Sequence, residues 1–389
     1  MIIGSKELIR DINTNLVLET IIDKSPISRA ALSKELGLTK ATISTIVQYL
    51  IDKQLVIEIG SDNTDLGRKP ILLTFNKDAG YALCIDIQPS YCCSILSNLQ
   101  ADSLRQDTIV TPESPKDLPN TLIQYVKDLQ STLTPSHYGL IGITLSVHGV
   151  TYQNDIKFTP YYDLSGINLA NELEEQLNIP TYLENEANLS ALGESTIVHD
   201  NSNLASISVH SGIGLGLIMN NHLVNGYKGY AGEVGHTIID IDGRPCPCGN
   251  NGCLEQYVSE KALLKEFSSL KNMKSASFED FKEAYKNNDS DAKTIVDLFI
   301  KYMSVGLNNI LNSYNPEVII INSSFTSSYP ELTEEIIKKL SSRMNNYSSI
   351  LPSSLNGKSS LIGGLCVAIK NFLGIKYLKM HNNFDSTTI

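Results

Sequence analysis

Long apolar runs are missing from this sequence. No stretch reaches the roughly eighteen apolar residues that a membrane-spanning helix needs. The first residues, MIIGSKELIRDINTN, carry charges and lack an apolar segment followed by a small-residue cleavage site, so they do not resemble a secretory signal. Both absences argue against a membrane or secreted protein. We expect a cytoplasmic protein, in which thiols stay reduced and disulfides are disfavoured.

Cysteine is scarce and unevenly placed. Only 7 of the 389 residues are cysteine, yet three of them lie with His236 in one segment, GHTIIDIDGRPCPCGNNGC. The donors His236, Cys246, Cys248 and Cys253 follow one another at short intervals, and the prolines and glycines between them let the chain fold back. Such donors favour a tetrahedral zinc ion, and four protein ligands predict a structural rather than a catalytic metal. The alternative is a loose loop with three reactive thiols.

Positive charge is in deficit, because the formal net charge is −11. This argues against a protein coated with nucleic acid. The first 54 residues, however, carry seven Lys or Arg and six Asp or Glu, so the acidic excess belongs to the rest of the chain. A near-neutral head on an acidic body fits a small nucleic-acid-binding module joined to a body with another task, although random variation would give the same counts. The length predicts two or three domains.

The stretch SPISRAALSKELGLTKATISTIVQYLIDKQLV predicts two helices joined by a tight turn. Ser28 and Thr39 are suited to cap the two helices, and Gly37 is suited to the turn between them. In the second helix, apolar residues recur at the spacing of one buried face. They are Ile43, Ile46, Val47 and Leu50.

The opposite face of the second helix is short, polar and without acids, which suits a helix that enters the major groove of DNA. The strands LVIEIG and PILLTF then predict a wing whose tip could reach the DNA backbone or minor groove. The predicted DNA contacts are Thr39, Lys40, Ala41, Ser44, Thr45, Gln48, Arg68 and Lys69. The alternative is a helical hairpin that serves only as a dimer arm.

From Asn76 onward, predicted strands alternate with predicted helices. Strands are expected in GYALCIDI, LIGITLSVHGV, NPEVIIINSS and on both sides of the glycine turn in LASISVHSGIGLGLIMNNHLV, and TYLENEANLSALGES is expected to leave a strand and enter a helix. Helices are expected in NLANELEEQL and TIVDLFIKYMSVGLNNILNSY. This order predicts an α/β body whose sheets are covered on both faces.

Three body segments carry a family resemblance. GEVGHTIIDIDGRPCPCGNNGCLE, ENEANLSALGE and SVHSGIGLGL resemble the signature, the sugar-site segment and the second glycine turn of the ROK family of repressors, open reading frames and sugar kinases. The winged head followed by GRKP resembles the repressor branch of that family. The resemblance covers nearly the whole chain. It implies a two-lobed body of the sugar-kinase, actin-like type, with one structural zinc ion per chain on the His-Cys segment.

The resemblance also implies which residues contact a sugar. They are Asn185, Glu186, Glu233, His236 and Glu255. His236 would bind the metal through one ring nitrogen and could offer the other to a hydroxyl. The segment FTPYYDLSGI departs from the family, whose members have Asn and then Trp near the sugar, whereas this sequence has no Trp. Tyr161, Tyr162 and Asp163 are candidates for that place, which leaves the identity of the sugar open.

A sugar kinase of this family is the serious rival to a repressor. The kinases carry Asp-x-Gly-x-Thr at a phosphate loop, and the matching residues here run from Asp86 to Ser90, DIQPS. Gln88 places a side chain where phosphate approaches, and Pro89 removes an N–H donor. A further glycine-rich turn, which contacts adenosine in the kinases, reads NSS here. Glu186 stands where the kinases have an Asp base. Displacing a carboxylate by about an ångström can reduce a rate on the order of a hundredfold.

These observations predict a sugar-responsive repressor that is not an enzyme. It should bind palindromic operator DNA as a homodimer, or as a tetramer, and release it with a monosaccharide; the resemblance to the repressor branch implies xylose as the first candidate. The alternatives are a ROK-type sugar kinase and a repressor whose body binds a protein partner or a different sugar. The expected domains are a winged head of residues 1–75, a smaller lobe of 76–183 plus 369–389, and a larger lobe of 184–368 with the sugar and metal sites.

Overall fold

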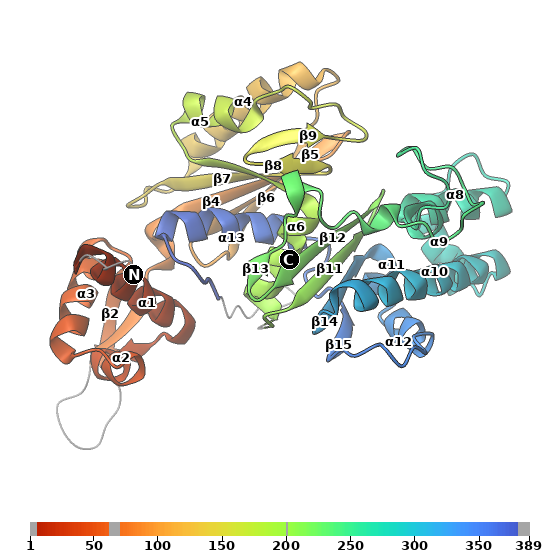
Figure 1. Ribbon diagram of the computed structural model, residues 1–389. Coiled ribbons are helices and arrows are strands. Elements are labelled where there is room, and N and C mark those ends of the chain that lie inside the picture. Colours follow the sequence, from red (N-terminus) through yellow and green to blue (C-terminus); the bar gives the residue numbers. More distant parts are fainter. Residues whose placement is uncertain (1–5, 62–70, 200, 380–389) are drawn as a thin grey trace. The chain divides into compact units, whose positions relative to one another are not determined.

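The computed structural model describes residues 6–61, 71–199 and 201–379 (Figure 1). The predicted wing contacts Arg68 and Lys69 therefore lie outside the described residues. The chain divides into two compact units. Unit 1 comprises Met1–Ser146, Asn154–Leu183 and Gly364–Ile389, and unit 2 comprises Val147–Gln153 and Glu184–Gly363. Within the described ranges, no helix combines the length and the apolar character needed to cross a membrane.

The N-terminal part of unit 1 holds three helices and a three-stranded sheet with the order β1-β3-β2. The helices are α1 (Lys6–Lys24), α2 (Arg29–Leu36) and α3 (Lys40–Asp52), and the strands are β1 (Ile27–Ser28), β2 (Val56–Ser61) and β3 (Ile71–Phe75). The Ser28 and Thr39 side chains cap α2 and α3 by accepting hydrogen bonds from backbone N–H groups. Gly37 ends α2 with a left-handed φ of 64°. These caps confirm the predicted helix boundaries.

The predicted apolar stripe of α3 is buried, and it forms part of the core of this region. Ile43 and Val47 are fully enclosed, as is Leu73 of β3. The stripe therefore fixes which face of α3 turns inward, and it leaves the polar face in solvent. The predicted contacts Thr39, Lys40, Ala41, Ser44, Thr45 and Gln48 are all exposed.

The remainder of unit 1 is built on a five-stranded sheet with the order β10-β7-β4-β5-β6. Its strands are β4 (Tyr81–Ile87), β5 (Tyr91–Asn98), β6 (Ser103–Val110), β7 (Leu140–Val147) and β10 (Thr181–Asn185). Figure 1 shows α4 (Leu118–Thr132) and α5 (Leu169–Leu177) on one side of this sheet and α13 (Ser359–Leu373) on the other. Two short strands, β8 (Val150–Tyr152) and β9 (Asp155–Phe158), follow β7.

The sequence prediction omitted β5 and β6. Both run antiparallel to their neighbours, so β4, β5 and β6 form a meander rather than a series of helix-linked parallel strands. β6 is an edge strand, SLRQDTIV, in which every residue is exposed or half-buried, and its polar composition hides it from a search for buried apolar runs.

Unit 2 has its own five-stranded sheet with the order β13-β12-β11-β14-β15. Its strands are β11 (Leu204–Val209), β12 (Ile213–Met219), β13 (His222–Leu223), β14 (Val318–Ser323) and β15 (Ser349–Pro352). Its helices are α6 (Glu186–Gly193), α7 (Glu255–Val258), α8 (Glu260–Leu270), α9 (Phe278–Lys286), α10 (Ser290–Tyr314), α11 (Ser324–Ser328) and α12 (Glu331–Lys338).

The two faces of the unit 2 sheet differ in polarity. Ala205, Ile207 and Val209 of β11 pack into the larger apolar core with residues of α8, α9 and α10. The alternate residues Ser206 and Ser208 point the other way and hydrogen-bond to residues of α6. The predicted cover on both faces is therefore confirmed for this sheet, with one apolar face and one face that mixes apolar residues with hydrogen-bonded serines.

Candidate metal centre and ligand site

The cysteine-rich loop is closed by backbone hydrogen bonds. The Ile239 N–H donates to the Gly252 carbonyl at 2.9 Å, and the Gly252 N–H donates to the Arg244 carbonyl at 2.7 Å. Gly252 has a φ of +72°, and a Cβ at this position would lie 1.6 Å from the Asp240 carbonyl oxygen. Only glycine fits so tight a fold-back. The loop is thus held in a shape that brings its two ends together.

This shape gathers the four predicted metal donors. One ligand atom from each of His236, Cys246, Cys248 and Cys253 lies within 4.8 Å of all the others. The Cys248 and Cys253 sulfurs are 3.6 Å apart, and the Cys246 sulfur is 3.7 Å from His236 Nδ1. A tetrahedral site with bonds of about 2.3 Å has edges of about 3.7 Å. The donor types and their spacing therefore fit a metal ion held by four protein ligands.

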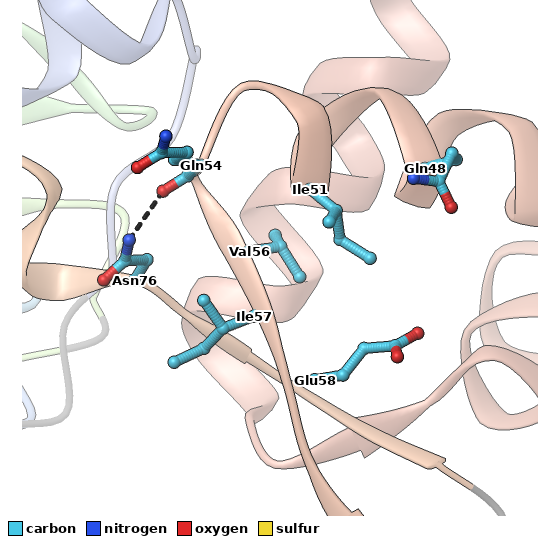
Figure 2. A pocket seen from close by; sticks show the side chains of 7 residues that line it. All are labelled: Gln48, Ile51, Gln54, Val56, Ile57, Glu58 and Asn76. Carbon is cyan, nitrogen blue, oxygen red and sulfur yellow. Dashed lines mark hydrogen bonds between the residues drawn. The ribbon is translucent and has the colours of Figure 1, made fainter. Parts of the chain in front are cut away.

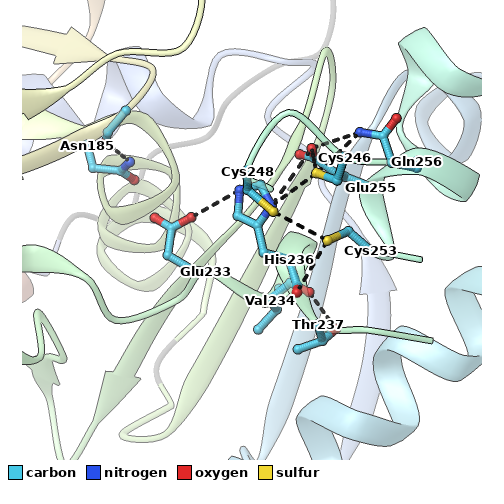
Figure 3. A network of polar contacts seen from close by, with 11 residues as sticks. Asn185, Glu233, Val234, His236, Thr237, Cys246, Cys248, Cys253, Glu255 and Gln256 are labelled. Atoms are coloured by element: carbon cyan, nitrogen blue, oxygen red, sulfur yellow. Dashed lines mark hydrogen bonds and ion pairs between the residues drawn. The ribbon is translucent and has the colours of Figure 1, made fainter. Parts of the chain in front are cut away.

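The structure shows two contacts of Cys246, with Glu255 and Gln256, that the sequence did not predict. The Cys246 thiol lies 3.1 Å from Glu255 Oε1, and the Gln256 side-chain amide lies 3.6 Å from the Cys246 sulfur and 3.0 Å from the same Glu255 oxygen. Gln256 therefore donates to both acceptors (Figure 3). Its place next to Glu255 at the start of α7 was the only signal in the sequence, and that signal does not specify a contact.

The two ring nitrogens of His236 face different carboxylates. Its Nδ1 faces Cys246 and lies 3.9 Å from Glu255 Oε1, whereas its Nε2 lies 3.7 Å from Glu233 Oε2. Partial burial raises the pKa of Glu233, while the neighbouring His236 opposes that shift. The structure thus brings together three of the five predicted sugar contacts, Glu233, His236 and Glu255. The ring orientation places Nδ1 toward Cys246 and Glu255 and Nε2 toward Glu233.

The other two predicted sugar contacts begin α6. Asn185 caps this helix, because its Oδ1 accepts hydrogen bonds from the backbone N–H groups of Ala187 and Asn188. Its amide nitrogen donates to the Gly149 carbonyl at 2.5 Å. Glu186 is nearly buried, and its Oε1 accepts a hydrogen bond of 3.1 Å from the Ser208 hydroxyl. Sequence reasoning missed Ser208, although a serine recurring at every second residue of an apolar strand was a usable signal.

Strand β12 supports both groups of predicted sugar contacts. α6 packs closely on this strand, since a Cβ on Gly216 would lie 2.1 Å from the Ala187 carbonyl oxygen. The Leu215 N–H donates to the Gly232 carbonyl at 3.1 Å, immediately before Glu233. Glycines of the second glycine turn therefore allow helix–sheet contact here.

The stretch that matches the kinase phosphate loop is closed on itself. Asp86, at the end of β4, is buried, and its carboxylate accepts hydrogen bonds of 2.6 Å from the Ser146 hydroxyl and 2.9 Å from the Gln88 amide. The Gln88 N–H donates to the Tyr91 carbonyl at 3.1 Å. The glutamine side chain thus lies against the aspartate that a phosphate-binding loop would keep available.

On α3, the exposed predicted contacts differ in how their polar groups are used. The Thr45 hydroxyl donates to the Ala41 carbonyl at 3.0 Å, and the Gln48 amide donates to Asp52 at 2.9 Å. Thr39 accepts the capping hydrogen bond of the helix. Lys40 begins α3 with its side chain exposed, so it is the best-placed residue of this set for a test of DNA binding.

Comparison with known proteins shows to which family the chain belongs. The family model described as "ROK family" matches residues 82–371. The chain belongs to the ROK family. This ROK chain is 38% identical to a protein named "Xylose repressor" from Bacillus spizizenii, over 96% of this chain and 99% of that protein.

Two solved structures resemble this ROK chain in fold. A ROK family transcriptional regulator described as a homolog of the E. coli MLC protein has a TM-score of 0.79 and 25% identity, covering 94% of this chain and 96% of that chain. A ROK family glucokinase from Streptomyces griseus has a TM-score of 0.66 and 21% identity, covering 74% of this chain and 99% of that chain. The sugar-kinase-like α/β fold is therefore established.

Proposed function

We propose that this protein is a sugar-responsive transcriptional repressor that binds operator DNA and releases it with a monosaccharide, xylose being the first candidate. The observation that carries the proposal is similarity along almost the whole chain to a protein named a xylose repressor. The regulator structure covers 94% of this chain, whereas the glucokinase covers 74%. The N-terminal helices before residue 82 lie outside the ROK family model, as expected for an added DNA-binding head.

In this proposal, residues 1–75 form a winged helix-turn-helix. The turn at Gly37 between α2 and α3, followed by the antiparallel pair β2 and β3, supports it. α3 would enter the major groove with Lys40 near phosphate, and Arg68 and Lys69 would contact DNA from the wing. The smaller lobe of residues 76–183 plus 369–389 and the larger lobe of 184–368 would form the sugar-binding body.

The metal in this proposal is zinc with a structural role. Three sulfurs and one imidazole nitrogen at tetrahedral spacing support zinc, since soft donors select it over magnesium or calcium. Zinc would fix the loop that carries His236 and Glu255. Asn185, Glu186, Glu233, His236 and Glu255 would then bind the hydroxyls of the sugar.

A kinase activity is the second candidate function, and the β4–β5 turn disfavours it. The side chain of Gln88 bonds to Asp86 where a phosphate loop needs glycine. We expect equilibrium dialysis to detect no ATP binding, even when xylose is present at a concentration that saturates the sugar site. ATP binding with phosphate transfer to xylose would replace the repressor proposal by a bifunctional one.

The DNA-binding part of the proposal is tested with Lys40→Ala and, as a control far from the head in sequence, Lys301→Ala. We expect Lys40→Ala to weaken operator binding and to reduce its salt dependence by about one phosphate contact, because one cation fewer releases one counterion fewer. Sugar affinity should stay unchanged. Footprinting should protect two half-sites, since a two-fold dimer places two recognition helices on a palindrome. A single protected half-site would contradict the dimer, and sedimentation would distinguish dimer from tetramer.

The switch is tested with Glu233→Gln. A sugar bound by groups on α6 and on the zinc loop favours the arrangement in which both segments reach it, and this shifts the population of states. If the DNA-free state binds sugar about tenfold more tightly, operator occupancy changes by about 1.4 kcal/mol. We expect the variant to bind operator but to respond poorly to xylose. If no sugar in a panel of monosaccharides moves the wild-type titration, the proposal fails.

A further inference from the structure

The C-terminal end of α3 is held by residues that lie beyond the head. The Lys53 carbonyl accepts a hydrogen bond of 2.7 Å from the Tyr138 hydroxyl. The next two carbonyls, of Gln54 and Leu55, accept hydrogen bonds from the side-chain amide and the backbone N–H of Asn76, at 2.7 and 2.9 Å. Figure 2 shows the Asn76 amide directed at the Gln54 carbonyl. Lys53 is the C-cap of α3, and carbonyls at a helix end have no partner within the helix, so the Tyr138 hydroxyl supplies one, while Asn76 holds the two residues that follow.

Tyr138 connects this helix end to α13. Its ring meets the ring of Phe372 edge-on, with centroids 4.8 Å apart and planes at 73°. Phe372 lies in the last turn of α13 (Ser359–Leu373). An edge-to-face pair of this kind adds directional packing to the apolar contact. The hydroxyl and the ring of Tyr138 therefore join α3 and α13 through one side chain.

The segment after α13 is also bonded to the head. Asn15 of α1 donates its side-chain amide to the Gly374 carbonyl at 2.7 Å. Glu19 of α1 accepts hydrogen bonds through one oxygen from the backbone N–H groups of Lys376 and Tyr377, at 2.8 and 3.0 Å. A carboxylate that accepts two N–H groups holds a segment more firmly than a neutral acceptor does. The end of α13 is thus bonded to α1 as well as to α3.

α13 itself belongs to both units of the chain. Residues Ser359–Gly363 are part of unit 2, and the helix from Gly364 onward is part of unit 1. A helix of this length, Ser359–Leu373, moves as a rigid element. A displacement of its first turn, in unit 2, therefore also displaces Phe372 in its last turn. The predicted sugar contacts are all in unit 2, and α13 is one of the covalent connections between that unit and unit 1, which contains the head.

We propose that Glu19, Asn76 and Tyr138 form a head anchor that makes the orientation of the recognition helix follow α13. The anchor rests on the proposed function, because it supplies the route by which a sugar bound in unit 2 alters operator binding. The three residues are positioning residues and contact neither sugar nor DNA. Losing them leaves both binding sites intact and reduces the coupling between them.

The test uses Tyr138→Phe and Glu19→Ala, singly and together, in the full chain. Tyr138→Phe removes the hydrogen bond to α3 and keeps the ring that packs on Phe372. Tyr81→Phe is the matched control, since the Tyr81 hydroxyl donates to the Thr134 carbonyl at 3.1 Å within the same unit without reaching the head. Glu19→Gln keeps an oxygen acceptor and should restore most of what Glu19→Ala loses.

The measured quantity is the coupling ratio, defined as operator affinity without sugar divided by operator affinity with saturating xylose. Such ratios are about 5- to 150-fold in allosteric proteins, and we expect the double variant to reduce it by at least about threefold. Xylose affinity by calorimetry and sugar-free operator affinity should stay within about twofold of wild type. Tyr81→Phe should leave all three quantities unchanged. A double variant with the wild-type ratio overturns the proposal.

Scanning calorimetry gives a second readout that does not depend on sugar. An anchored head unfolds together with its lobe, whereas a released head unfolds in a separate, earlier transition. We expect the double variant to show that separate transition and Tyr81→Phe not to show it. If no sugar changes operator binding by the wild type, the proposed function fails. Calorimetry then tests by itself whether the head anchor exists. Identical melting of wild type and double variant overturns it.

Discussion

The cysteine loop and the β4–β5 turn use polar side chains in opposite ways. In the cysteine loop, four donor atoms lie within 4.8 Å of one another, and the pairs that face each other are separated by 3.6 and 3.7 Å. These distances are too long for strong hydrogen bonds and right for edges of a tetrahedron around a metal. In the β4–β5 turn, Asp86 is bonded at 2.6 and 2.9 Å to the chain's own Ser146 and Gln88.

The difference teaches how to distinguish a site that needs a ligand from one whose groups satisfy one another. Groups that converge on a common point without bonding one another need a ligand to become stable. Groups that satisfy one another need none, and a ligand would have to compete with them. The first arrangement predicts strong dependence on a metal, and the second predicts indifference to phosphate.

The largest expected effect comes from Cys248→Ser. Removing one of four ligands should abolish metal binding and lower the free energy of unfolding by on the order of 3–5 kcal/mol, because metal-binding energy is also folding energy. Elemental analysis and thermal melting of the purified variant measure both. Cys93→Ser, a partly exposed cysteine outside the cluster, is the control. If the Cys248→Ser variant keeps one metal per chain, the cysteine loop does not depend on its four donors, and the contrast with the β4–β5 turn is wrong.

A smaller effect is expected from Gln256→Leu. A metal-bound thiolate at Cys246 and the carboxylate of Glu255 are like charges, and the Gln256 amide is placed to donate to both. Losing such a partner typically costs about 10- to 100-fold in metal affinity. Competition with a chromogenic chelator measures this affinity. Gln124→Leu, which removes an exposed Gln–Asp pair on α4, should leave it unchanged.

Gln88→Leu should lower stability by about 1–2 kcal/mol, since it leaves a buried carboxylate with one partner fewer. Chemical denaturation measures the change, while metal content and sugar affinity serve as internal controls. The variant should not bind ATP. A gain of ATP binding would mean that the glutamine alone closes a functional phosphate loop.

The smallest effect is expected from Pro89→Ala in the same turn. Pro89 is exposed, and its replacement mainly increases the freedom of the unfolded chain, for a loss of about 0.4–1 kcal/mol. The same denaturation experiment distinguishes this loss of stability from the larger loss expected for Gln88→Leu. A loss larger than that of Gln88→Leu would show that the proline ring, rather than the bonds to Asp86, holds the turn.

Local signals in the sequence predicted the head well. Ser28, Gly37 and Thr39 act within three residues along the chain, and the apolar stripe of α3 has only one way to be buried. The four metal donors were found for the same reason, since their spacing is short and their chemistry is distinctive. Strand β6 was missed because an exposed edge strand carries no buried apolar run.

The sequence by itself determined which residue types are available, where helices begin and end, and which loop can gather a metal. Only the tertiary structure decided which ring nitrogen of His236 faces Cys246, that Gln256 bonds to Cys246, and that Tyr138 joins α3 to α13. Those facts depend on residues brought together from distant parts of the chain. The free energy of such contacts comes from packing and orientation, which spacing along a sequence does not encode.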